Sequence, residues 1–490
     1  MNWMEHLLPE FFRHLSTVTR WLLLALEIGI VIIAAGHVIL RQRDSRAAAF
    51  WAVIIIFVPF FGALFYSVFG INRLRRRGKQ YRKDPDLKRV KAGDAVPASP
   101  WEKAPELKEL RSLARTLNNI TRFEFTIGNR IGIYHNGDQA MPAMLEAIQG
   151  AQRSITLSSY IFEAKGIGEK FVEALAAAHA RGVEVRVLVD DAGTRYSWPP
   201  VTRILGKLGV RTDRFMPHRF ILRILTMNLR NHRKILVIDG QLGFTGGMNI
   251  RQGNMISENP KHPVRDMHFR VEGPVVRQLQ RVFAEDWAFC SGEILGGPQW
   301  YPDHTPAGAV AAIGIPDGPD EDIEVIPRAI FAGIAAAKRE ICVMTPYFLP
   351  DPQIIWALNL AVARGVDVKI ITPKHNNIPP VRWASRTLYP SMLERGVKIY
   401  ENQGVFDHTK FMTVDGLWSL IGSTNWDPRS LRLNFEFNLA CFDNDLAAEL
   451  NAGFKEKLKE SLLVAQKDLD AEGPLAHLRD GIARMFIPVL

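Results

Sequence analysis

Two stretches of the chain repeat the same order of polar residues in an otherwise apolar setting. The first is residues 231–249, NHRKILVIDGQLGFTGGMN, and the second is residues 407–425, DHTKFMTVDGLWSLIGSTN. In each stretch a histidine and a lysine lie two positions apart, so they share one face of an extended segment. A buried strand needs neither residue at its end, and their repetition in register therefore indicates chemistry. The repeated residues are His232, Lys234, Asp239 and Asn249 in the first stretch and His408, Lys410, Asp415, Ser423 and Asn425 in the second.

The two stretches predict a single site if the halves of the chain meet across a pseudo-two-fold axis. Such a pocket would hold two imidazoles and two ammonium groups, with Asn249, Asn425 and Ser423 as further donors. Cationic donors stabilise the charge that develops on a phosphate. One histidine can attack phosphorus or deprotonate a nucleophile while the other protonates the leaving oxygen, because imidazole titrates near neutral pH. No acidic metal cage is visible, so we expect neither a metal nor another cofactor.

The elements that must position these residues also occur twice. The joint ARGVEVRVLV at residues 180–189 returns as ARGVDVKIIT at residues 363–372. This is a duplication of a unit too long for a solenoid repeat. Alternating strands and helices predict α/β layers around mostly parallel or mixed sheets flanked by helices. The predicted strand, helix and strand of each unit are 154–162, 168–181 and 183–189 in the first, and 340–349, 353–364 and 366–372 in the second.

Each histidine–lysine pair leads into a predicted hairpin. Residues 235–238 are β-branched or leucine, as in a buried strand, and Asp239-Gly240 is a turn signal. Asp415-Gly416 repeats that signal. Asp239 and Asp415 belong to the repeated pattern and are therefore kept among the candidate catalytic residues. Their Asp-Gly context favours a role in shaping the hairpin over direct chemistry.

The two halves differ just before the first histidine. His232 lies 22 residues after Val210, whereas His408 lies 11 residues after Val397. The additional residues, around 220–230, mix large apolar side chains with arginines. Two interpretations remain open for them: a surface helix, or a loop that enters the lipid interface and admits substrate.

The amino-terminal part of the chain predicts a membrane anchor. Residues 21–40 and 48–70 are apolar and each long enough to cross a bilayer, and Pro59 breaks the second of them. The basic run NRLRRRGKQYRK that follows places residue 72 onward in the cytoplasm by the positive-inside rule. The net charge of +10 indicates an anionic partner, and basic residues beside a span favour lipid over nucleic acid.

Four regions follow from these patterns. We expect a two-helix membrane anchor at 1–71, a basic juxtamembrane segment and linker at 72–118, a first half at 119–300 and a second half at 301–490. The three cysteines stand alone in apolar runs and match neither a disulfide framework nor a zinc spacing. We interpret them as buried thiols.

The repeated stretches resemble the paired signature of the phospholipase D superfamily. HRKILVID and HTKFMTVD both fit H-x-K-x4-D, and each is followed by a small-residue and asparagine element, GGMN or GSTN. The two apolar segments, RDMHFRVEGPVV, NWDPRSLRLNFEFNLACFD and the terminal ARMFIPVL are similar to segments of bacterial cardiolipin synthases. The resemblance covers nearly the whole chain.

This resemblance implies two phospholipase D-like domains and a metal-independent phosphatidyl transfer in two steps. Two phosphatidylglycerol molecules would give cardiolipin and glycerol, in the bacterial inner membrane with the catalytic part on the cytoplasmic side. It implies that His232 is the nucleophile that forms a phosphohistidine, and that His408 is the general acid and then the general base. Lys234 and Lys410 would bind the phosphoryl oxygens, and Asn249, Asn425 and Ser423 would complete that clamp.

The resemblance also implies a carboxylate behind each histidine, which fixes its tautomer. Glu436 lies at the matching place in the second half, 28 residues after His408. Asp266 is its counterpart in the first half.

Other functions remain open at this point. Water as the acceptor would make the enzyme a phospholipase, and an amino alcohol would give a different lipid. The same histidine pair cleaves DNA in a membrane-tethered nuclease, against which stand the apolar spans and the absence of an aromatic stacking pattern. A non-catalytic lipid-binding scaffold would not need paired histidines. A homo-oligomer is compatible with the sequence.

Overall fold

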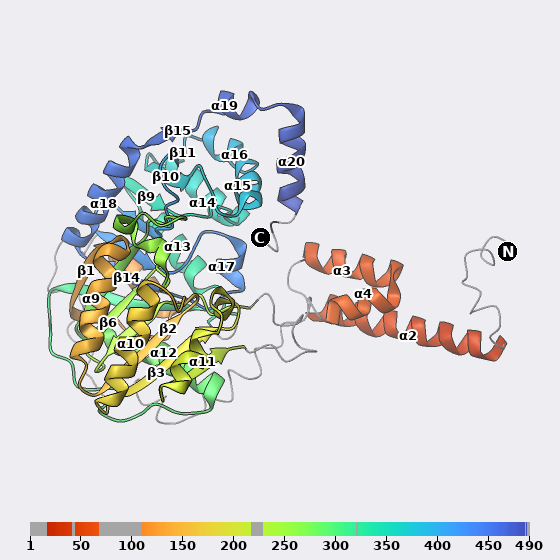
Figure 1. The fold of residues 1–490 in the computed structure, drawn as a ribbon. Coiled ribbons are helices and arrows are strands. Elements are labelled where there is room, and N and C mark those ends of the chain that lie inside the picture. Colours follow the sequence, from red (N-terminus) through yellow and green to blue (C-terminus); the bar gives the residue numbers. More distant parts are fainter. Residues whose placement is uncertain are drawn as a thin grey trace. The chain divides into compact units, whose positions relative to one another are not determined.

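The computed structural model describes residues 17–41, 45–67, 110–216, 229–319, 322–485 and 487. These residues divide into two units, a small one that contains residues 17–67 and a large one that contains the residues from 110 onward (Figure 1). The basic run after residue 71 and most of the predicted insertion at 220–230 lie outside the described residues. The two units are described separately.

The small unit begins with α2, Thr17–Arg41, a helix of 25 residues. It is long and apolar enough to cross a membrane. The first predicted span is therefore present as one helix, which indicates that the chain is anchored in a membrane.

The second predicted span is not a single helix. It forms α3, Ser45–Phe57, and α4, Pro59–Phe65, with a break at Val58. Proline disfavours helical backbone in the residue before it and lacks an amide donor, which explains the break. A Cβ on Gly62 would lie 2.6 Å from the carbonyl oxygen of Ile54, so α4 folds back onto α3. The expectation of two full-length spans is corrected to one long helix and a broken helical hairpin.

The described strands of the large unit form one 15-stranded sheet. From one edge to the other its order is β15-β11-β10-β9-β12-β13-β14-β8-β1-β7-β6-β5-β2-β3-β4. The strands are β1 Thr126–His135, β2 Ser154–Ser159, β3 Glu184–Asp190, β4 Arg211–Phe215, β5 Ile235–Ile238, β6 Leu242–Gly246, β7 Met267–Glu272, β8 Val310–Asp317, β9 Glu340–Met344, β10 Asp367–Pro373, β11 Lys398–Asn402, β12 Phe411–Val414, β13 Trp418–Gly422, β14 Glu436–Phe442 and β15 Ser461–Leu463.

The duplication is visible in the strand order. Outward from the central β8–β1 pair, the first half runs β1-β7-β6-β5-β2-β3-β4 and the second runs β8-β14-β13-β12-β9-β10-β11. Each of these strands therefore has an equivalent at the same distance from the centre, and β15 is an additional strand at the edge of the second half. β6 and β13 are also in contact, so the sheet brings the inner parts of the two halves together.

Of the expected mostly parallel or mixed sheet, the mixed arrangement is the one observed. Among the described strands, only β2-β3-β4 and β9-β10-β11 pair in parallel. The strand after each histidine–lysine pair instead runs antiparallel to its neighbour, as in the pairs β2–β5 and β9–β12, and then turns back through the Asp-Gly hairpin into a second antiparallel pair. The sheet is therefore mixed.

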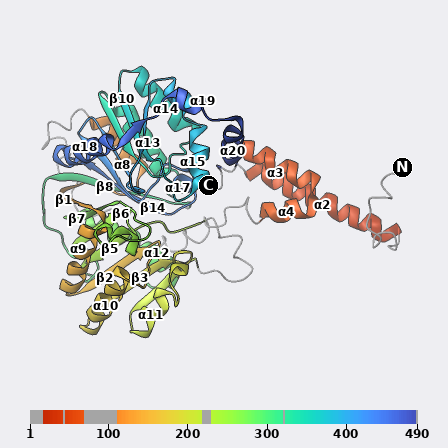
Figure 2. The ribbon, with the colours of Figure 1, turned by 45° about the horizontal axis from the view of Figure 1, so that its top comes forward.

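Helices cover both faces of the sheet (Figure 2). Thr156 of β2 donates a hydrogen bond of 2.9 Å to Gln280 of α12, and Thr413 of β12 contacts Asn451 of α18 at 2.6 Å. The next residue of β2, Leu157, faces the apolar cluster that includes residues of α9 and α10. The helices of the large unit are α8 Arg111–Ile120, α9 Asn136–Gly150, α10 Ile167–Ala180, α11 Val201–Lys207, α12 Val276–Ser291, α13 Val325–Ala336, α14 Pro352–Ala363, α15 Pro379–Arg386, α16 Pro390–Leu393, α17 Pro428–Arg432, α18 Asn444–Lys459, α19 Gln466–Asp470 and α20 Pro474–Met485.

Candidate active site

The first histidine is tied to the second half of the chain through the backbone. His232 precedes β5, and its amide donates to the carbonyl of Phe435 at 2.9 Å. The amide of Phe435 in turn donates to the carbonyl of Arg230 at 2.8 Å. This short parallel bridge places His232 beside the residue that follows Phe435, which is Glu436.

The second histidine is held in the same way by the first half. The His408 amide donates to the carbonyl of Arg265 at 2.7 Å, and the Arg265 amide donates to the carbonyl of Phe406 at 3.0 Å. His408 consequently lies beside Asp266. The two bridges are equivalent, as a pseudo-two-fold relation between the halves requires.

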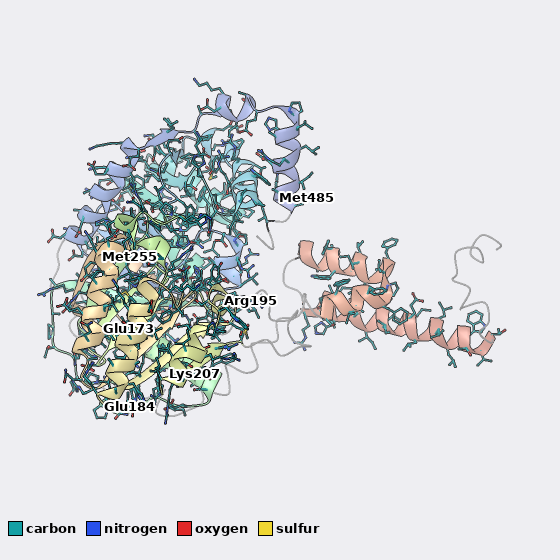
Figure 3. The ribbon with its side chains drawn as sticks, in the orientation of Figure 1. Glu173, Glu184, Arg195, Lys207, Met255 and Met485 are labelled. Carbon is teal, nitrogen blue, oxygen red and sulfur yellow. The ribbon has the colours of Figure 1, made fainter. Side chains whose placement is uncertain are left out.

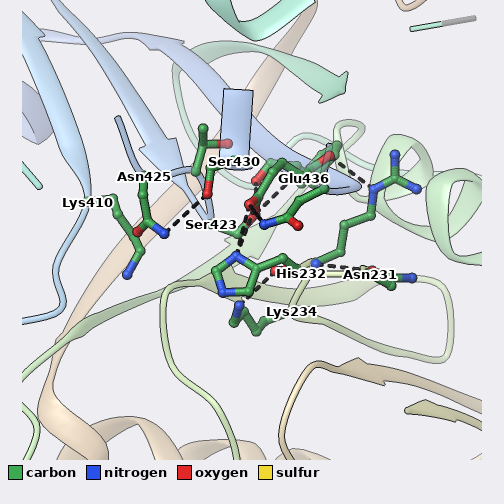
Figure 4. Close-up of polar contacts among 12 residues, drawn as sticks. Asn231, His232, Lys234, Lys410, Ser423, Asn425, Ser430 and Glu436 are labelled. Carbon is green, nitrogen blue, oxygen red and sulfur yellow. Dashed lines mark hydrogen bonds and ion pairs between the residues drawn. The ribbon is translucent and has the colours of Figure 1, made fainter. Parts of the chain in front are cut away.

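The histidine–carboxylate pairs therefore cross between the halves. His232 Nδ1 lies 2.9 Å from Oε1 and 3.1 Å from Oε2 of Glu436 (Figure 4). His408 Nδ1 lies 2.8 Å from Oδ2 of Asp266. The spacing of 28 residues paired Glu436 with His408, the histidine of its own half. That pairing is corrected, because each carboxylate serves the histidine of the opposite half.

The two imidazoles are buried and packed against aromatic rings. The Tyr160 ring meets His232 edge-on at 5.2 Å between centroids, and Tyr347 meets His408 at 5.9 Å. Burial lowers the pKa of His232 to about 4, and burial together with Lys410 lowers the pKa of His408 well below its usual value. A neutral imidazole that donates from Nδ1 to a carboxylate presents the lone pair of Nε2, which is the form needed for attack on phosphorus.

The two carboxylates differ in their surroundings. Glu436 accepts hydrogen bonds from His232, from the Ser423 hydroxyl and from Asn434 Nδ2 at 3.3 Å. Burial disfavours the charged carboxylate, but these donors and the charge of His232 outweigh it and lower the pKa of Glu436. For Asp266, burial dominates and raises the pKa to about 7. The first histidine thus has the more firmly ionised partner.

The two lysines lie beside their histidines. Lys234 Nζ donates to the carbonyl of His232 at 2.7 Å, and Lys410 Nζ lies 2.6 Å from His408 Nδ1. Burial lowers the pKa of Lys234 to about 7 and that of Lys410 to about 8. An anion bound beside them would favour the protonated forms, because burial disfavours an ammonium group without an adjacent counter-charge.

The predicted oxygen-binding donors separate into two groups. Asn249 and Asn425 line the cavity. Asn249 Oδ1 accepts from the Ile161 amide at 3.0 Å, so its amide nitrogen remains for substrate. Ser423 is fully buried and donates to Glu436 instead. The expected role of Ser423 in the phosphate clamp is therefore corrected to support of the carboxylate.

Asp239 and Asp415 lie at the opposite ends of their strands from the histidines. The Asp239 carboxylate accepts the backbone amides of residues 152–154, and the Asp415 carboxylate accepts those of residues 338–340. Both aspartates have positive φ, 53° and 55°, as the hairpin requires. Neither lines the cavity. Their inclusion among catalytic residues is corrected, whereas the prediction that they shape the hairpin is confirmed.

A cavity of about 220 Å³ lies where the halves meet. Three arginines that the repeat did not reveal line its wall: Arg230, Arg251 and Arg429. Arg251 follows Asn249 by two residues and Arg429 follows Asn425 by four. This proximity to the repeated asparagines is the sequence signal that could have identified them. The other lining residues are Tyr160, Ile161, Tyr196, His232, Asn249, Asn254, Val264, Asp266, Tyr347, Asn377, Ile378, Val381, Phe406, His408, Asn425, Asp427, Ser430 and Asn434.

Within the described part of the chain, no group of three or more histidine, cysteine, aspartate or glutamate side chains is placed to hold a metal ion. In this part of the chain, the cationic side chains that line the cavity are Arg230, Arg251 and Arg429. What this arrangement can do is bind a phosphate with two imidazoles on it, one to attack and one to exchange a proton with an oxygen.

Comparison with known proteins agrees with this chemistry. A family model described as the phospholipase D-like domain of cardiolipin synthase matches residues 144–287 and 330–458, one histidine–lysine pair in each. A model described as phospholipase D-nuclease N-terminal matches residues 29–70. The large unit also resembles the crystal structure of a phosphatidylserine synthase from Haemophilus influenzae, with a TM-score of 0.58 and 14% identity over 77% of this chain and 100% of that one. That likeness concerns the fold.

Relatives match along almost the entire chain. A cardiolipin synthase of Geobacillus thermodenitrificans is 33% identical over 466 residues, which cover 94% of this chain and 92% of that protein. Cardiolipin synthase A of Pseudomonas fluorescens is 30% identical over 490 residues, 99% of this chain and 100% of its own length. The duplicated fold, the crossed histidine–carboxylate pairs and these matches lead to one conclusion: the chain belongs to the cardiolipin synthases of the phospholipase D superfamily.

Proposed function

We propose that the enzyme transfers a phosphatidyl group from one phosphatidylglycerol to another, which releases glycerol and forms cardiolipin. One observation carries the proposal: two imidazoles share one cavity, and each is oriented by a carboxylate from the opposite half. A phosphoryl transfer that proceeds through a covalent intermediate needs such a pair, one group to attack and one to manage the proton.

In the first step, His232 Nε2 attacks the phosphorus of the donor lipid, and the bond from phosphorus to the glycerol oxygen breaks. The ionised Glu436 holds the proton on Nδ1 and stabilises the positive charge that develops on the ring. His408 gives a proton to the departing glycerol. Burial and Lys410 lower the pKa of His408, and a bound phosphate anion would favour its protonated form.

In the second step, His408 accepts the proton of the acceptor hydroxyl, whose oxygen attacks the phosphorus on His232. The bond from phosphorus to Nε2 breaks, and cardiolipin leaves. Asp266, with a pKa raised to about 7, can share the proton that His408 gains and loses. Lys234 and Lys410 lie beside the histidines, where they would bind the phosphoryl oxygens in both steps.

Two phosphatidylglycerol molecules bring two phosphates, and the cavity is lined by arginines in addition to the two lysines that lie beside the histidines. Arg230 and Arg251 come from the first half, where the equivalent positions of the second half carry Phe406 and Asp427. Arg251 Nε lies 3.5 Å from Oε1 of Glu163. We assign these asymmetric arginines to the acceptor phosphate, because the repeated transfer machinery does not require them.

We place the enzyme in the bacterial inner membrane, with α2 as its anchor and the large unit in the cytoplasm. The basic residues after position 71 support this side. If the α3–α4 hairpin also crosses the bilayer, the amino terminus lies on the same side as the large unit. If it does not cross, the amino terminus lies on the opposite side. Protease accessibility of a tag at residue 1, compared with one at residue 490, in inverted membrane vesicles tests both placements.

The function is tested with purified full-length enzyme in vesicles of labelled phosphatidylglycerol, with a chelator present. We expect cardiolipin and free glycerol in equal amounts, and neither from His232→Ala. Phosphatidic acid as the main product would make water the acceptor, and a need for added divalent metal would contradict the metal-independent mechanism. Cleavage of plasmid DNA under the same conditions would favour the nuclease alternative.

A further inference from the structure

The last helix of the large unit exposes an apolar face. In α20, Leu475, Leu478, Ile482 and Met485 are 82, 61, 49 and 78% exposed. Their spacing of three, four and three residues places them on one side of the helix. Single exposed apolar residues are ordinary, but four that form a continuous stripe mark an interaction surface.

The opposite face of α20 lies against the wall of the active-site cavity. Ala483 and Ile487 belong to an apolar cluster that includes Val381 and Tyr347. Val381 and Tyr347 also line the cavity. The helix therefore packs against the cavity wall. The partner that covers its exposed face determines toward which surroundings the cavity opens.

Two further features strengthen the attachment of α20. The Arg479 guanidinium lies 4.9 Å from the centre of the Trp383 ring in α15, a cation–π contact. Arg386 of α15 forms an ion pair with Glu472, just before α20. Both contacts fix the helix to α15, the element that carries Val381, so the exposed stripe keeps a constant orientation relative to the cavity.

The mouth of the cavity is apolar and aromatic as well. Ile378 and Tyr196 line the cavity and are 41 and 56% exposed. Trp198, two residues after Tyr196, is 85% exposed. Tryptophan and tyrosine are typical of the membrane–water interface. In Figure 3 the labelled Arg195, next to Tyr196, and Met485 lie along the same side of the large unit.

We propose that the exposed face of α20 docks on the lipid bilayer and thereby turns the cavity mouth toward the lipid head groups. The inference rests on the proposed function, since only an enzyme whose substrate is a bilayer lipid needs its mouth held there. An amphipathic helix in the interface buries its apolar face among the acyl chains and keeps polar residues in the head-group region. The exposed His477 and Arg484 of α20 suit an anionic lipid surface.

A second copy of the chain is the other partner that could cover this face. The bilayer is favoured because Ile378, an exposed apolar residue of the cavity wall, stands at the start of α15, the helix to which α20 is attached. A protein partner on this surface would cover the approach of a lipid to the site, whereas a bilayer supplies the lipid.

Docking is measured directly with a fluorescent probe. Leu478→Cys in the full-length enzyme is labelled with bimane and reconstituted in phosphatidylglycerol vesicles with and without lipids that carry a quencher on the acyl chain. Burial raises the thiol pKa of the three native cysteines, so they label slowly, and unsubstituted enzyme gives the background. Ile294→Cys is the matched control, because Ile294 is 52% exposed and follows α12 of the first half.

We expect quenching of the probe at position 478 and little at position 294. Equal, weak quenching at both positions would overturn the proposal, as would protection of position 478 that accompanies a doubling of mass in detergent. This readout does not depend on catalysis, so it separates failure of docking from failure of the proposed function.

Activity supplies the second test. Leu478→Glu with Ile482→Glu should lower cardiolipin formation in vesicles about tenfold, since two charges replace the inserted side chains. Turnover of short-chain phosphatidylglycerol dispersed in detergent should stay within about twofold of the unsubstituted enzyme, because a soluble substrate reaches the cavity without docking. Leu478→Trp should retain vesicle activity, and Ile294→Glu should affect neither assay. Equal loss of both activities in the double variant would contradict the proposal.

Discussion

At the scale of residues, the crossed pairs make different predictions for the two carboxylates. Glu436→Gln removes the charge behind His232, so formation of the phosphohistidine should fall by roughly 10²–10⁴. Asp266→Asn acts on His408 and should slow both steps, because His408 protonates the departing glycerol while the phosphohistidine forms and later takes the proton of the acceptor. Acid-quenched enzyme with phosphorus-labelled substrate, mapped by peptide, measures the first effect. Undiminished formation of the label on His232 in Glu436→Gln would contradict the crossed pairing.

The Ser423 hydroxyl is one of the donors that keep Glu436 ionised. Ser423→Ala should raise the pKa of this carboxyl, because a donor to its charged form is lost. The low-pH limb of the profile of kcat/KM should move upward in pH, with activity near pH 8 reduced by less than about tenfold. A uniform loss at every pH would place Ser423 on the substrate. The first half has a glycine, Gly247, at the position equivalent to Ser423, and a Cβ there would collide with the Asp266 carboxylate. The first half therefore offers no matching substitution.

The buried lysines predict how anion binding depends on pH. Burial lowers the pKa of Lys234 to about 7 and of Lys410 to about 8, and only the protonated forms attract a phosphate. Affinity for inorganic phosphate should therefore be highest below pH 7 and fall as pH rises through 7 to 8, with proton uptake on binding. Calorimetry in buffers of different ionisation enthalpy measures that uptake. Lys410→Met should remove the upper part of the pH dependence, and an unchanged profile in that variant would contradict the assignment.

At the scale of elements, the aspartates of the repeated motif should matter for stability and not for the chemical step. Asp239→Ala removes the acceptor of three backbone amides and a residue that tolerates positive φ. We expect a loss of roughly 2–3 kcal/mol in the free energy of unfolding and a kcat within about threefold of the unsubstituted enzyme where it is folded. Thermal unfolding and kcat, measured on one preparation, separate the effects. A large fall in kcat with unchanged stability would restore Asp239 to the chemistry.

The order of elements was predictable because it depends on local pattern. The repeated joint at 180–189 and 363–372 correctly indicated a helix followed by a strand in both halves. Strand direction was not predictable in this way, because a buried strand has the same apolar run whether its neighbour is parallel or antiparallel. Pro59 predicted an interruption of the second apolar run, and the structure confirms it as the break at Val58. The full length of the run nevertheless led to the prediction of a second span.

The candidate site shows the same boundary between local and tertiary information. Spacing within each repeat identified both histidines and both asparagines of the cavity, and both lysines that lie beside the histidines. Which carboxylate meets which histidine depends on bridges between residues more than 140 positions apart, such as Arg265 with Asp407. Spacing could not decide whether the Ser423 hydroxyl donates to the substrate or to Glu436, because its position after the hairpin is compatible with either acceptor. Tertiary packing decides such cases.

At the scale of the whole molecule, the crossed pairs make the site a property of one complete chain. Each half supplies a histidine and the carboxylate for the other half's histidine, so neither half is a catalytic unit, whereas a single chain contains all four groups. A homo-oligomer would therefore carry several complete sites, and association need not contribute side chains to any of them.

This argument predicts the outcome of mixing two inactive variants in one membrane. His232→Ala lacks the nucleophile and His408→Ala lacks the acid and base, and every chain in the mixture lacks one of them. Co-reconstituted His232→Ala and His408→Ala should form no more cardiolipin than either variant alone, whatever their oligomeric state. If the halves were exchanged between subunits, random dimers would instead restore roughly a quarter of the activity, because some dimers would assemble one intact site from the two unaltered halves. Cardiolipin formation at equal total protein, with unsubstituted enzyme diluted fourfold as the reference, distinguishes the two arrangements.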